Sequence, residues 1–448
     1  MLQGPFGPFF RHLAKALRKA GHRVTKVHLN GADMADWGGL PGSVLFRDPR
    51  GRWSAWLRRL MIERHLTDLI VYGDCQDYHR EAISVARSCG LRIHVFEQGY
   101  FRPHWVTLER DGVNGFSPRL GRPFAGGIPA ARQDEAAAGP LCARASRGVR
   151  RAHVAQTIIA ALATYGLSPL FPTYRSPFAA SGWSQAWGSL RRYVHLRRTR
   201  ARRLRRIAAY IRRPEPYFLV LLQRPGDSQL TVHSPFPCLE QAMERIIGSF
   251  AAHAPVPVRL LFKCHPLDPG LDDHAATLRR MARAHGVAGR VGYADGGVLR
   301  EMLDWSCGAV TVNSTAGLVA LEAGRPTVVL GRALYDVSGL TFQDGLDRFW
   351  CEGRPPDPRR FKAFRRWLMA ETQVMGNFWT RAGIALALPT IVARLTAPAA
   401  AQERAADRFE VAEPSLARAA AGEGGSDLGG FDNGGLGKAR AGPVVRSA

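Results

Sequence analysis

The sequence contains few cysteines and no paired-cysteine motif. Its 7 cysteines, in 448 residues, are scattered, odd in number and never spaced as CxxC. A disulfide framework and a cysteine zinc site are therefore not expected, because both need paired or clustered thiols. The HExxH and DxD signatures are also missing, so the sequence predicts no metal site and no cofactor. The same cysteine pattern favours a reducing, cytoplasmic compartment.

Long hydrophobic runs are missing as well. The longest uncharged stretch, Val154 to Tyr174, is interrupted by Gly166, Pro169 and Pro172. This stretch is too broken for a transmembrane helix, and it favours a core or interfacial helix instead. The N-terminus lacks a basic region followed by an apolar core, so no signal peptide is expected.

Acidic residues are the third shortage. The chain has 37 Asp and Glu against 62 Lys and Arg, a formal net charge of +25. Such a balance implies an acidic partner, which can be nucleic acid, anionic lipid or an anionic substrate. The shortage is sharpest in the segment Arg191–Arg213, which contains 11 arginines and no acid.

Three interpretations of this basic segment stay open from charge alone. A solvated linker helix and a nucleic-acid contact are two of them. The third is attachment to an anionic lipid surface, where aromatic side chains are common. Trp183, Trp187 and Tyr193 precede or interleave with the arginines, which suits an interface.

Strand-like and helix-like segments alternate in two halves of the chain. The first half has strands at 68–72 and 92–96 around a helix at 78–89, and the second has strands at 217–222, 258–263, 309–312 and 327–330. This alternation predicts parallel, doubly wound sheets, in which ligands lie beyond the carboxyl ends of the strands. Only Met1 and Leu2 precede the first loop, so the first strand is expected to be missing or short.

These elements predict an α/β, GT-B-like fold: two Rossmann-like domains that face a cleft, a C-terminal helix and a disordered tail. We expect an N-terminal domain over 1–213, with a helical, basic insert at about 118–213, and a C-terminal domain over 214–345. A helical segment over 346–398 follows. The tail over 399–448 is rich in Ala, Gly and Glu and has few large apolar residues, which is typical of disorder.

Three short motifs follow strand-like runs. Glu97 offers a carboxylate, Lys263 and His265 offer a cation and an imidazole, and 313–317 offers hydroxyls and backbone N–H groups before a helix. A helix N-terminus favours an anion. Together the motifs predict a cleft for a phosphate-linked donor, as in a sugar transferase that uses a nucleotide sugar.

Six strings also carry a resemblance to a known family. They are Gln3–Phe10, Tyr72–Cys75, Phe96–Arg102, Gln223–Gln229, Phe262–Pro266 and Val312–Gly317. In this order, over about residues 1–345, they resemble the bacterial capsule polysaccharide biosynthesis and export family, the KpsS/LipB group. The later strings are also similar to motifs of bacterial transferases that use CMP-sialic acid.

The resemblance implies a β-Kdo glycosyltransferase of capsule polysaccharide biosynthesis. Such an enzyme moves Kdo from CMP-Kdo to a phosphatidylglycerol-type lipid, with retention of configuration, and thereby starts the glycolipid anchor of the capsule. The C-terminal domain would bind the CMP-sugar and the N-terminal domain the acceptor. The protein would be peripheral at the inner face of the inner membrane, and no metal would be needed.

With the resemblance, three residues become catalytic candidates. Asp227, after the turn Pro225–Gly226, is the candidate nucleophile, since a retaining transfer can use a carboxylate. Glu97 is the candidate acid/base for the acceptor hydroxyl, and His265 would hold the CMP phosphate. The alternative roles are an Asx-turn for Asp227 and a strand-end cap for His265. The related pattern usually has a second acid where Gln98 stands.

Binding roles are assigned in the same way. Some of these residues also have an alternative role. Ser314 and Thr315 can simply cap the following helix, Glu322 can be a solvated carboxylate, and Arg102 can be a surface arginine. The candidate donor-binding residues are Lys263, His265, Asn313, Ser314, Thr315, Glu322, Gln223 and Gln229. The candidate acceptor- or carboxylate-binding residues are Arg102, Gly4 and Gly7.

The expected partners are a CMP-sugar donor, an anionic phospholipid acceptor, a membrane surface contacted through Arg191–Arg213, and capsule assembly or export machinery. Nucleic acid is not expected, because no recognised binding module is present. Two other functions stay open: a non-catalytic capsule export adaptor, and a transferase that uses another nucleotide sugar.

Overall fold

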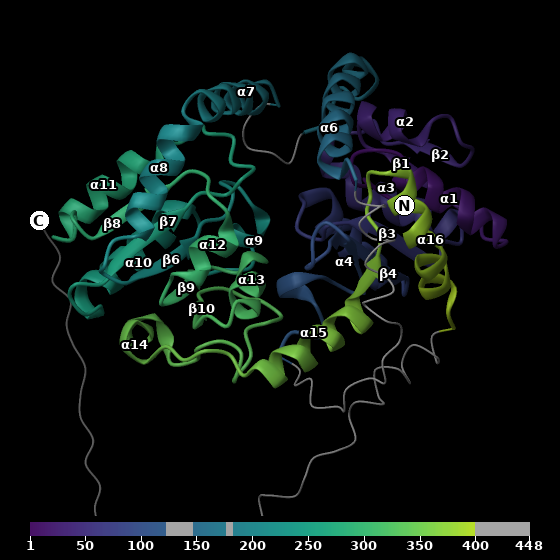
Figure 1. Cartoon of the computed structure of the whole chain (residues 1–448). Helices are drawn as coiled ribbons and strands as arrows, with labels where there is room; N and C mark the ends of the chain where they lie inside the picture. The colour runs from purple at the N-terminus through teal and green to yellow at the C-terminus, as the bar shows by residue number, and fades with distance from the viewer. Residues whose placement is uncertain (122–146, 176–181, 399–448) are drawn as a thin grey trace, which may run out of the picture.

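The computed structural model describes residues 1–121, 147–175 and 182–398. The predicted disordered tail and residues 122–146 of the predicted insert lie outside the described residues. Two α/β units stand beside each other, and α15 (Pro358–Thr372) runs between them (Figure 1). None of the described helices is long and apolar enough to cross a bilayer.

The sheet of the C-terminal unit is entirely parallel, as predicted. Its strand order is β10-β9-β6-β7-β8. β6 lies in the centre and all its residues are buried, as expected for a strand covered on both faces. The strands are β6 (Tyr217–Leu221), β7 (Arg259–Lys263), β8 (Val291–Ala294), β9 (Gly308–Thr311) and β10 (Thr327–Val329).

Side chains alternate along β6 between two cores. Phe218 and Val220 belong to a core that includes residues of α10 (Leu239–His253), α11 (His274–Ala284) and α14 (Gly345–Glu352). Leu219 belongs to the opposite core. That second core includes residues of α8 (Arg200–Ile211), α12 (Leu299–Asp304) and α13 (Ala316–Glu322). The doubly wound arrangement is therefore confirmed for this half.

The sheet of the N-terminal unit is mixed: its two predicted strands are parallel as expected, but two further strands, which the sequence did not indicate, pair antiparallel. Its order is β11-β5-β4-β3, and only β3 and β4 are parallel. The connection from β4 to β5, residues 99–104, is too short for a parallel crossover, so β5 must return antiparallel. The strands are β3 (Asp68–Tyr72), β4 (Arg92–Gln98), β5 (Trp105–Arg110) and β11 (Gln373–Met375).

A parallel strand pair, β1 (Lys26–His28) and β2 (Ser43–Leu45), lies beside this sheet. Met1 and Leu2 join the pair to β3: Val27 N donates to Met1 O and Leu2 N donates to Ile70 O, both at 3.0 Å. The short first strand expected from the sequence is thus represented by two residues.

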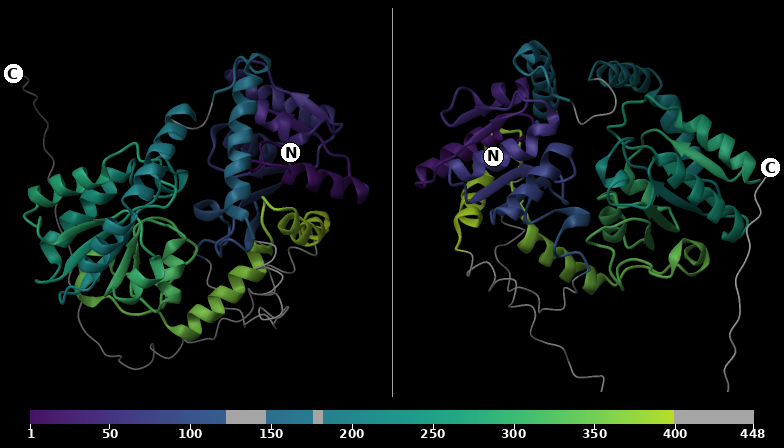
Figure 2. Two further views of the ribbon diagram at one scale, coloured as in Figure 1. Left: turned by 45° about the horizontal axis from the view of Figure 1, so that its top comes forward. Right: turned by 180° about the vertical axis from the view of Figure 1, so that it is seen from behind.

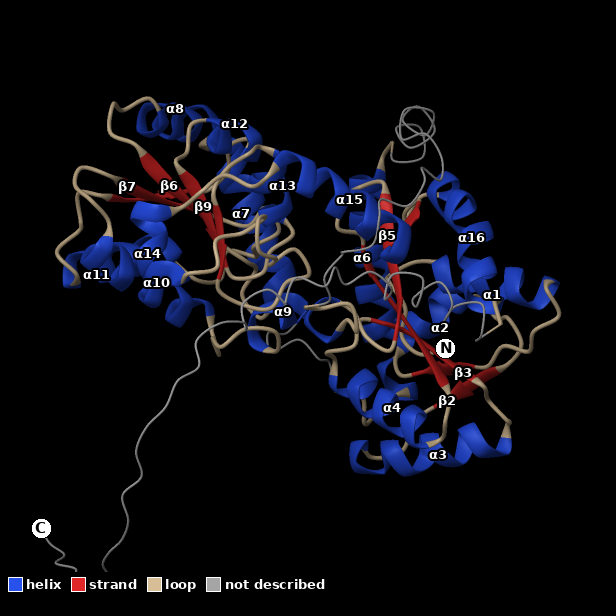
Figure 3. Ribbon diagram, turned by 90° about the horizontal axis from the view of Figure 1, so that it is seen from below, coloured by secondary structure: helices blue, strands red, loops and turns tan. Residues whose placement is uncertain are grey.

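Helices surround the N-terminal unit, and the chain returns to it after residue 372 (Figure 3). Phe9 and Phe378 pack edge to face with ring centroids 4.8 Å apart, next to Phe96. Ile384, Ala387 and Ile391 of the last helix belong to the same core. The last helix therefore closes the N-terminal unit, and the GT-B-like organisation is confirmed. The helices are α1 (Phe9–Lys19), α2 (Gly31–Trp37), α3 (Trp53–Glu63), α4 (Asp77–Ser88), α6 (Val149–Gly166) and α16 (Arg381–Thr396).

The basic segment packs on the C-terminal unit, although the predicted domain limits assigned it to the N-terminal domain. α7 (Gly182–Arg198) and α8 fall within 1–213, yet α8 packs on the C-terminal sheet. Ile207 is buried there, and Tyr210 Oη donates to Leu260 O at 3.1 Å. Ile207, Tyr210 and Ile211 lie among the arginines and pack into the core of the C-terminal unit. Burial of these side chains holds α8 on that unit.

Candidate active site

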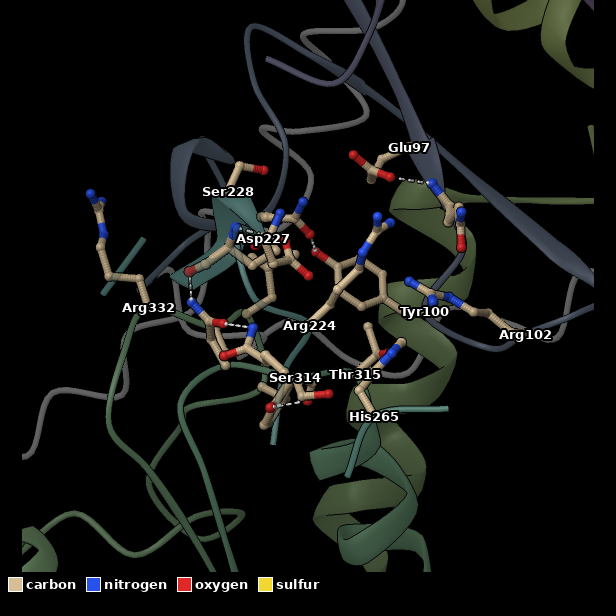
Figure 4. Close-up of a pocket in the computed structure, with 18 of the residues that line it drawn as sticks. Glu97, Tyr100, Arg102, Arg224, Asp227, Ser228, His265, Ser314, Thr315 and Arg332 are labelled. Carbon is tan, nitrogen blue, oxygen red and sulfur yellow. Dashed lines mark hydrogen bonds between the residues drawn. The ribbon is translucent and has the colours of Figure 1, made fainter. Parts of the chain in front are cut away.

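A cavity of about 250 Å³ lies between the two units (Figure 4). The C-terminal unit supplies the segments that follow β6, β7 and β9, and the N-terminal unit supplies the end of β4 and the turn after it. The strand order reverses between β6 and β9, and such a switch point is where open α/β sheets bind ligands. The cavity is therefore the candidate active site.

Two carboxyl groups reach the cavity from opposite units. Glu97, at the end of β4, accepts a hydrogen bond from Gln98 N at 2.8 Å. Burial raises the pKa of Glu97 to about 7, and the charges of Asp74 and Asp227 add to this, against the Gln98 N–H and Arg102. A carboxyl group with a pKa near neutrality can accept or donate a proton at working pH.

Asp227 follows the predicted tight turn, in which Gly226 has a φ of 72°. Its side chain accepts from Gln229 N at 2.9 Å and caps the short helix α9 (Ser228–Thr231). Burial raises the pKa of Asp227, and the Gln229 N–H, Arg102 and Arg224 oppose that rise. The Asx-type cap and a place in the cavity therefore occur together.

His265 lies just after β7 and lines the cavity. Its Nδ1 accepts from Leu267 N at 3.1 Å, so the proton of the neutral ring is on Nε2, which can donate. Burial lowers the pKa of His265 to about 4, and Arg102 and Arg224 contribute to this. In the unliganded protein His265 is thus a neutral donor at pH 7, and a bound anion would raise its pKa.

Amide side chains link the ends of β6 and β9. Gln223 Nε2 donates to Asn313 Oδ1 at 2.6 Å, and Asn313 Nδ2 donates to Gln229 O at 2.7 Å. Gln223 Oε1 is buried and has no hydrogen-bond partner in this arrangement. Since a buried acceptor without a partner is costly, a ligand hydroxyl or amino group is expected to bond to it.

Ser314 and Thr315 line the cavity ahead of α13. Ser314 Oγ accepts from Ala316 N at 3.2 Å, whereas Thr315 makes no side-chain cap. Tyr335 Oη donates to Ser314 O at 2.5 Å and holds this turn in place. The capping interpretation therefore applies to Ser314 alone.

Arginines give the cavity its positive charge. Arg102, a predicted binding residue, is exposed and lines the cavity with Arg224 and Arg332. Arg224 stood inside a quoted motif without an assigned role, and Arg332 follows β10, where the sequence offers no signal. Sequence reasoning also missed Tyr100, whose Oη donates to Asn114 Oδ1 at 2.8 Å.

Four predicted binding residues do not line the cavity. Lys263 is buried at the end of β7, and only His265, beyond the strand, reaches the cavity. Glu322 is half exposed and pairs with Arg365 at 3.8 Å. A Cβ on Gly4 would meet the Phe10 ring, and one on Gly7 would meet Gln156, so these glycines serve packing within the N-terminal unit.

Within the described parts of the chain, one group of side chains has metal-ligand chemistry: Asp74, Cys75 and His233. The donor atoms already contact each other, with Cys75 Sγ 3.1 Å from His233 Nε2 and 3.2 Å from Asp74 Oδ1. None of the three lines the cavity. The contact joins the two units, since Cys75 follows β3 and His233 follows α9.

Residues 67–379 match the family model described as "Capsule polysaccharide biosynthesis protein". The chain belongs to this family. It is 32% identical over 388 residues to the capsule polysaccharide modification protein LipB of Neisseria meningitidis serogroup A, covering 85% of this chain and 91% of LipB. It is 31% identical to the capsule polysaccharide export protein KpsS of Escherichia coli, covering 85% of this chain and 96% of KpsS.

Among solved structures, the chain is similar to Thermosulfurimonas dismutans KpsC, described as a β-Kdo 2,7 transferase. The identity is 13% and the TM-score 0.41, over 88% of this chain and 98% of that one. A likeness at this level does not establish an activity.

Proposed function

We propose that this protein is a capsule β-Kdo transferase that moves Kdo from CMP-Kdo to a phosphatidylglycerol-type lipid with retention of configuration. The observation that carries the proposal is the cavity between the units. Two carboxyl groups with raised pKa values, Glu97 and Asp227, face it from opposite sides. CMP-Kdo is anionic at its phosphate and at its sugar carboxylate, and the cavity supplies arginines and an imidazole N–H for both.

In the first step, the ionised Asp227 attacks the anomeric carbon of Kdo. The bond from that carbon to the phosphate oxygen breaks, and CMP leaves with the electron pair. His265 Nε2–H donates to the departing phosphate, and Arg224 and Arg332 offset its charge. Gln223 and Asn313 hold the donor at the ends of β6 and β9.

In the second step, an acceptor hydroxyl attacks the same carbon and releases Asp227. Glu97 takes the proton of this hydroxyl. A pKa of about 7 suits this exchange, and two displacements at one carbon give retention. Arg102, an exposed arginine in the lining of the cavity, would bind the acceptor phosphate or the Kdo carboxylate.

The proposed transfer needs no metal or other cofactor. Arginines supply the positive charge that Mg²⁺ would otherwise give, and His265 supplies an N–H donor. Transfer should therefore proceed at an unchanged rate in excess EDTA. A loss of rate that Mg²⁺ or Zn²⁺ restores would contradict this and would direct attention to Asp74, Cys75 and His233.

We also propose that the protein acts as a peripheral protein at the inner face of the inner membrane. Many arginines of α7 and α8 are exposed, and each cation near an anionic surface contributes about 1 kcal/mol. Arg192 is an exception, because it turns inward and donates to Asp295 Oδ1 at 2.5 Å. Capsule assembly or export machinery remains a predicted partner.

The test is direct. Purified protein is incubated with CMP-Kdo and lyso-phosphatidylglycerol, and the lipid is followed by mass spectrometry. The wild type should add the mass of one Kdo, and Asp227→Asn should not, although Asn can keep the cap on Gln229 N. Asp357→Asn is the matched control, because Asp357 caps α15 at an exposed position.

The export name of one relative keeps a non-catalytic adaptor as the alternative. In cells that lack the protein, an adaptor carrying Asp227→Asn would still restore capsule export, whereas a transferase would not. If wild-type protein leaves CMP-Kdo intact, other nucleotide sugars are tested with the same lipid.

A further inference from the structure

We propose that the outer faces of α6 and α7 dock on an anionic lipid bilayer, with α6 inserting its apolar side chains. This refines the membrane partner in the proposed function and depends on that function only for the acceptor. The arginine-rich segment pointed to a surface contact through charge. The structure adds an apolar helix face in a segment outside that basic band.

One side of α6 packs against the N-terminal unit. Ala160 is buried, and Gln156 Nε2 donates to Trp379 O at 3.0 Å. The opposite side of a surface helix is normally polar. Here it carries Val154, Ile158 and Leu162 at four-residue spacing, with exposed fractions of 53%, 55% and 63%.

Ile159 and Tyr165 widen this face, with 55% and 42% of each side chain exposed. α6 contains no acidic residue, and these five exposed side chains make its outer side largely apolar. Helices of this kind are buried in a core or in lipid, and contiguous exposed apolar patches mark binding surfaces.

Charge identifies the kind of surface. Arg150 and Arg151 are exposed at the start of α6, and neither α7 nor α8 contains an acid. On α7, Trp187 and Tyr193 are 69% and 56% exposed. Exposed aromatic and aliphatic side chains beside arginines suit the headgroup region of an anionic bilayer.

The two helices lie at the same end of the molecule. Figure 1 and the right-hand view of Figure 2 show α6 and α7 at this end, one on each unit. A flat membrane could therefore contact both. Nucleic acid would use the arginines but not an aliphatic face. A second copy would bring two acid-free surfaces together, which like charges oppose.

Vesicle flotation with the full chain tests the proposal without any sugar nucleotide. Vesicles of phosphatidylcholine with 30% phosphatidylglycerol are compared with pure phosphatidylcholine. Leu162→Glu should lower binding to the anionic vesicles at least tenfold. Ile62→Glu is the matched control: Ile62 lies on α3 with 60% exposure, and this variant should bind as the wild type does.

Wild-type binding by folded Leu162→Glu would overturn the proposal. So would a dimer, seen by light scattering, that Leu162→Glu dissociates while vesicle binding is unchanged, or a nucleic-acid complex that this variant alone loses. A second readout protects against misfolding: Trp187→Phe should reduce quenching of tryptophan fluorescence by brominated lipids. Transfer to a short-chain, water-soluble acceptor should persist in Leu162→Glu, which separates failed docking from failed catalysis.

Discussion

Gln223 and Asn313 lie 90 residues apart in sequence and are joined by a hydrogen bond of 2.6 Å. The bond ties the segment after β6 to the segment after β9 and leaves Gln223 Oε1 pointing to no partner. The two motifs were proposed separately for donor binding, and the hydrogen bond between Gln223 and Asn313 holds them together at one place in the cavity.

Gln223→Leu should therefore weaken CMP binding. The change removes the free acceptor and leaves Asn313 Oδ1 without its donor, and one lost hydrogen bond corresponds to about a tenfold increase in Kd. Isothermal titration with CMP measures the change. Gln343→Leu, at a loop residue that does not line the cavity, is the control. An unchanged Kd for Gln223→Leu would mean that Oε1 does not face the ligand.

Glu97 should set the pH dependence of transfer. Its pKa is about 7, and the base form is required, so kcat/KM should rise with pH through this value. Glu97→Gln should lower the rate by roughly 10²- to 10⁴-fold and remove this part of the profile. A profile of the same shape in Glu97→Gln would exclude Glu97 as the titrating group.

The same pKa makes a prediction for stability. Between the ordinary value of 4.5 and about 7, the folded protein binds more protons at Glu97 than the unfolded chain does. The contribution of Glu97 to the free energy of unfolding therefore falls as pH rises through this range. At pH 8, Glu97→Gln should stabilise the fold by about 1–3 kcal/mol, measured by urea unfolding, and by little at pH 4.5.

His265 should be neutral, with its proton on Nε2, in the free protein at pH 7. Nitrogen-15 NMR of the imidazole tests this tautomer, and the titration should give a pKa near 4. CMP should raise that pKa because its phosphate favours the charged ring. His265→Ala should weaken CMP binding by about ten- to a hundredfold, whereas His22→Ala, at an exposed position, should not. A CMP-independent titration would remove His265 from the phosphate site.

Arg192 should act on the site through the loop that carries His265. Besides Asp295, it donates to Asp268 O at 2.5 Å and His265 O at 3.4 Å. Arg192→Ala should cost about 1–3 kcal/mol in urea unfolding, because it leaves a half-buried carboxylate unpaired. It should also weaken CMP binding, whereas the exposed Arg198→Ala should do neither. A stable variant with normal CMP affinity would show that the loop keeps its shape without Arg192.

Residues 373–396 should contribute to the stability of the N-terminal unit, and Phe378 tests this. It is fully buried and contacts Phe9 and Phe96. Phe378→Ala should destabilise the protein by about 3–5 kcal/mol, measured by thermal or urea unfolding. Trp305→Ala, where the side chain is 70% exposed, should change stability by less than about 0.5 kcal/mol. Equal effects would mean that residues 373–396 are only loosely attached.

Much of the C-terminal unit could be predicted from sequence. Its buried strands read as apolar runs such as 217–222, which is typical of a parallel sheet covered on both faces, and the helices between them are long enough for parallel crossovers. The N-terminal sheet could not be read in this way. The direction of β5 depends on a short connection, and β11 comes from more than 260 residues later in the chain.

The site shows the same division. Glu97, Asp227, His265 and Asn313 were recognisable because each lies at or beyond the carboxyl end of a strand, where α/β sheets bind their ligands. Arg332 and Tyr100 had no such signal. Lys263 was grouped with His265, but it lies within β7 and is buried there, whereas His265 lies beyond the strand and lines the cavity.

The sequence by itself determined the family, the alternation of strands and helices, and the segments that form the carboxyl edge of the second sheet. These properties depend on local periodicity and on residues close together in the chain. Tertiary structure decided which carboxyl groups share a cavity, which arginines face it, and which unit holds the basic helix α8. It also turned Arg192 inward and left Leu162 outward. Those outcomes depend on packing between distant segments, and local sequence does not encode which of several apolar faces is buried.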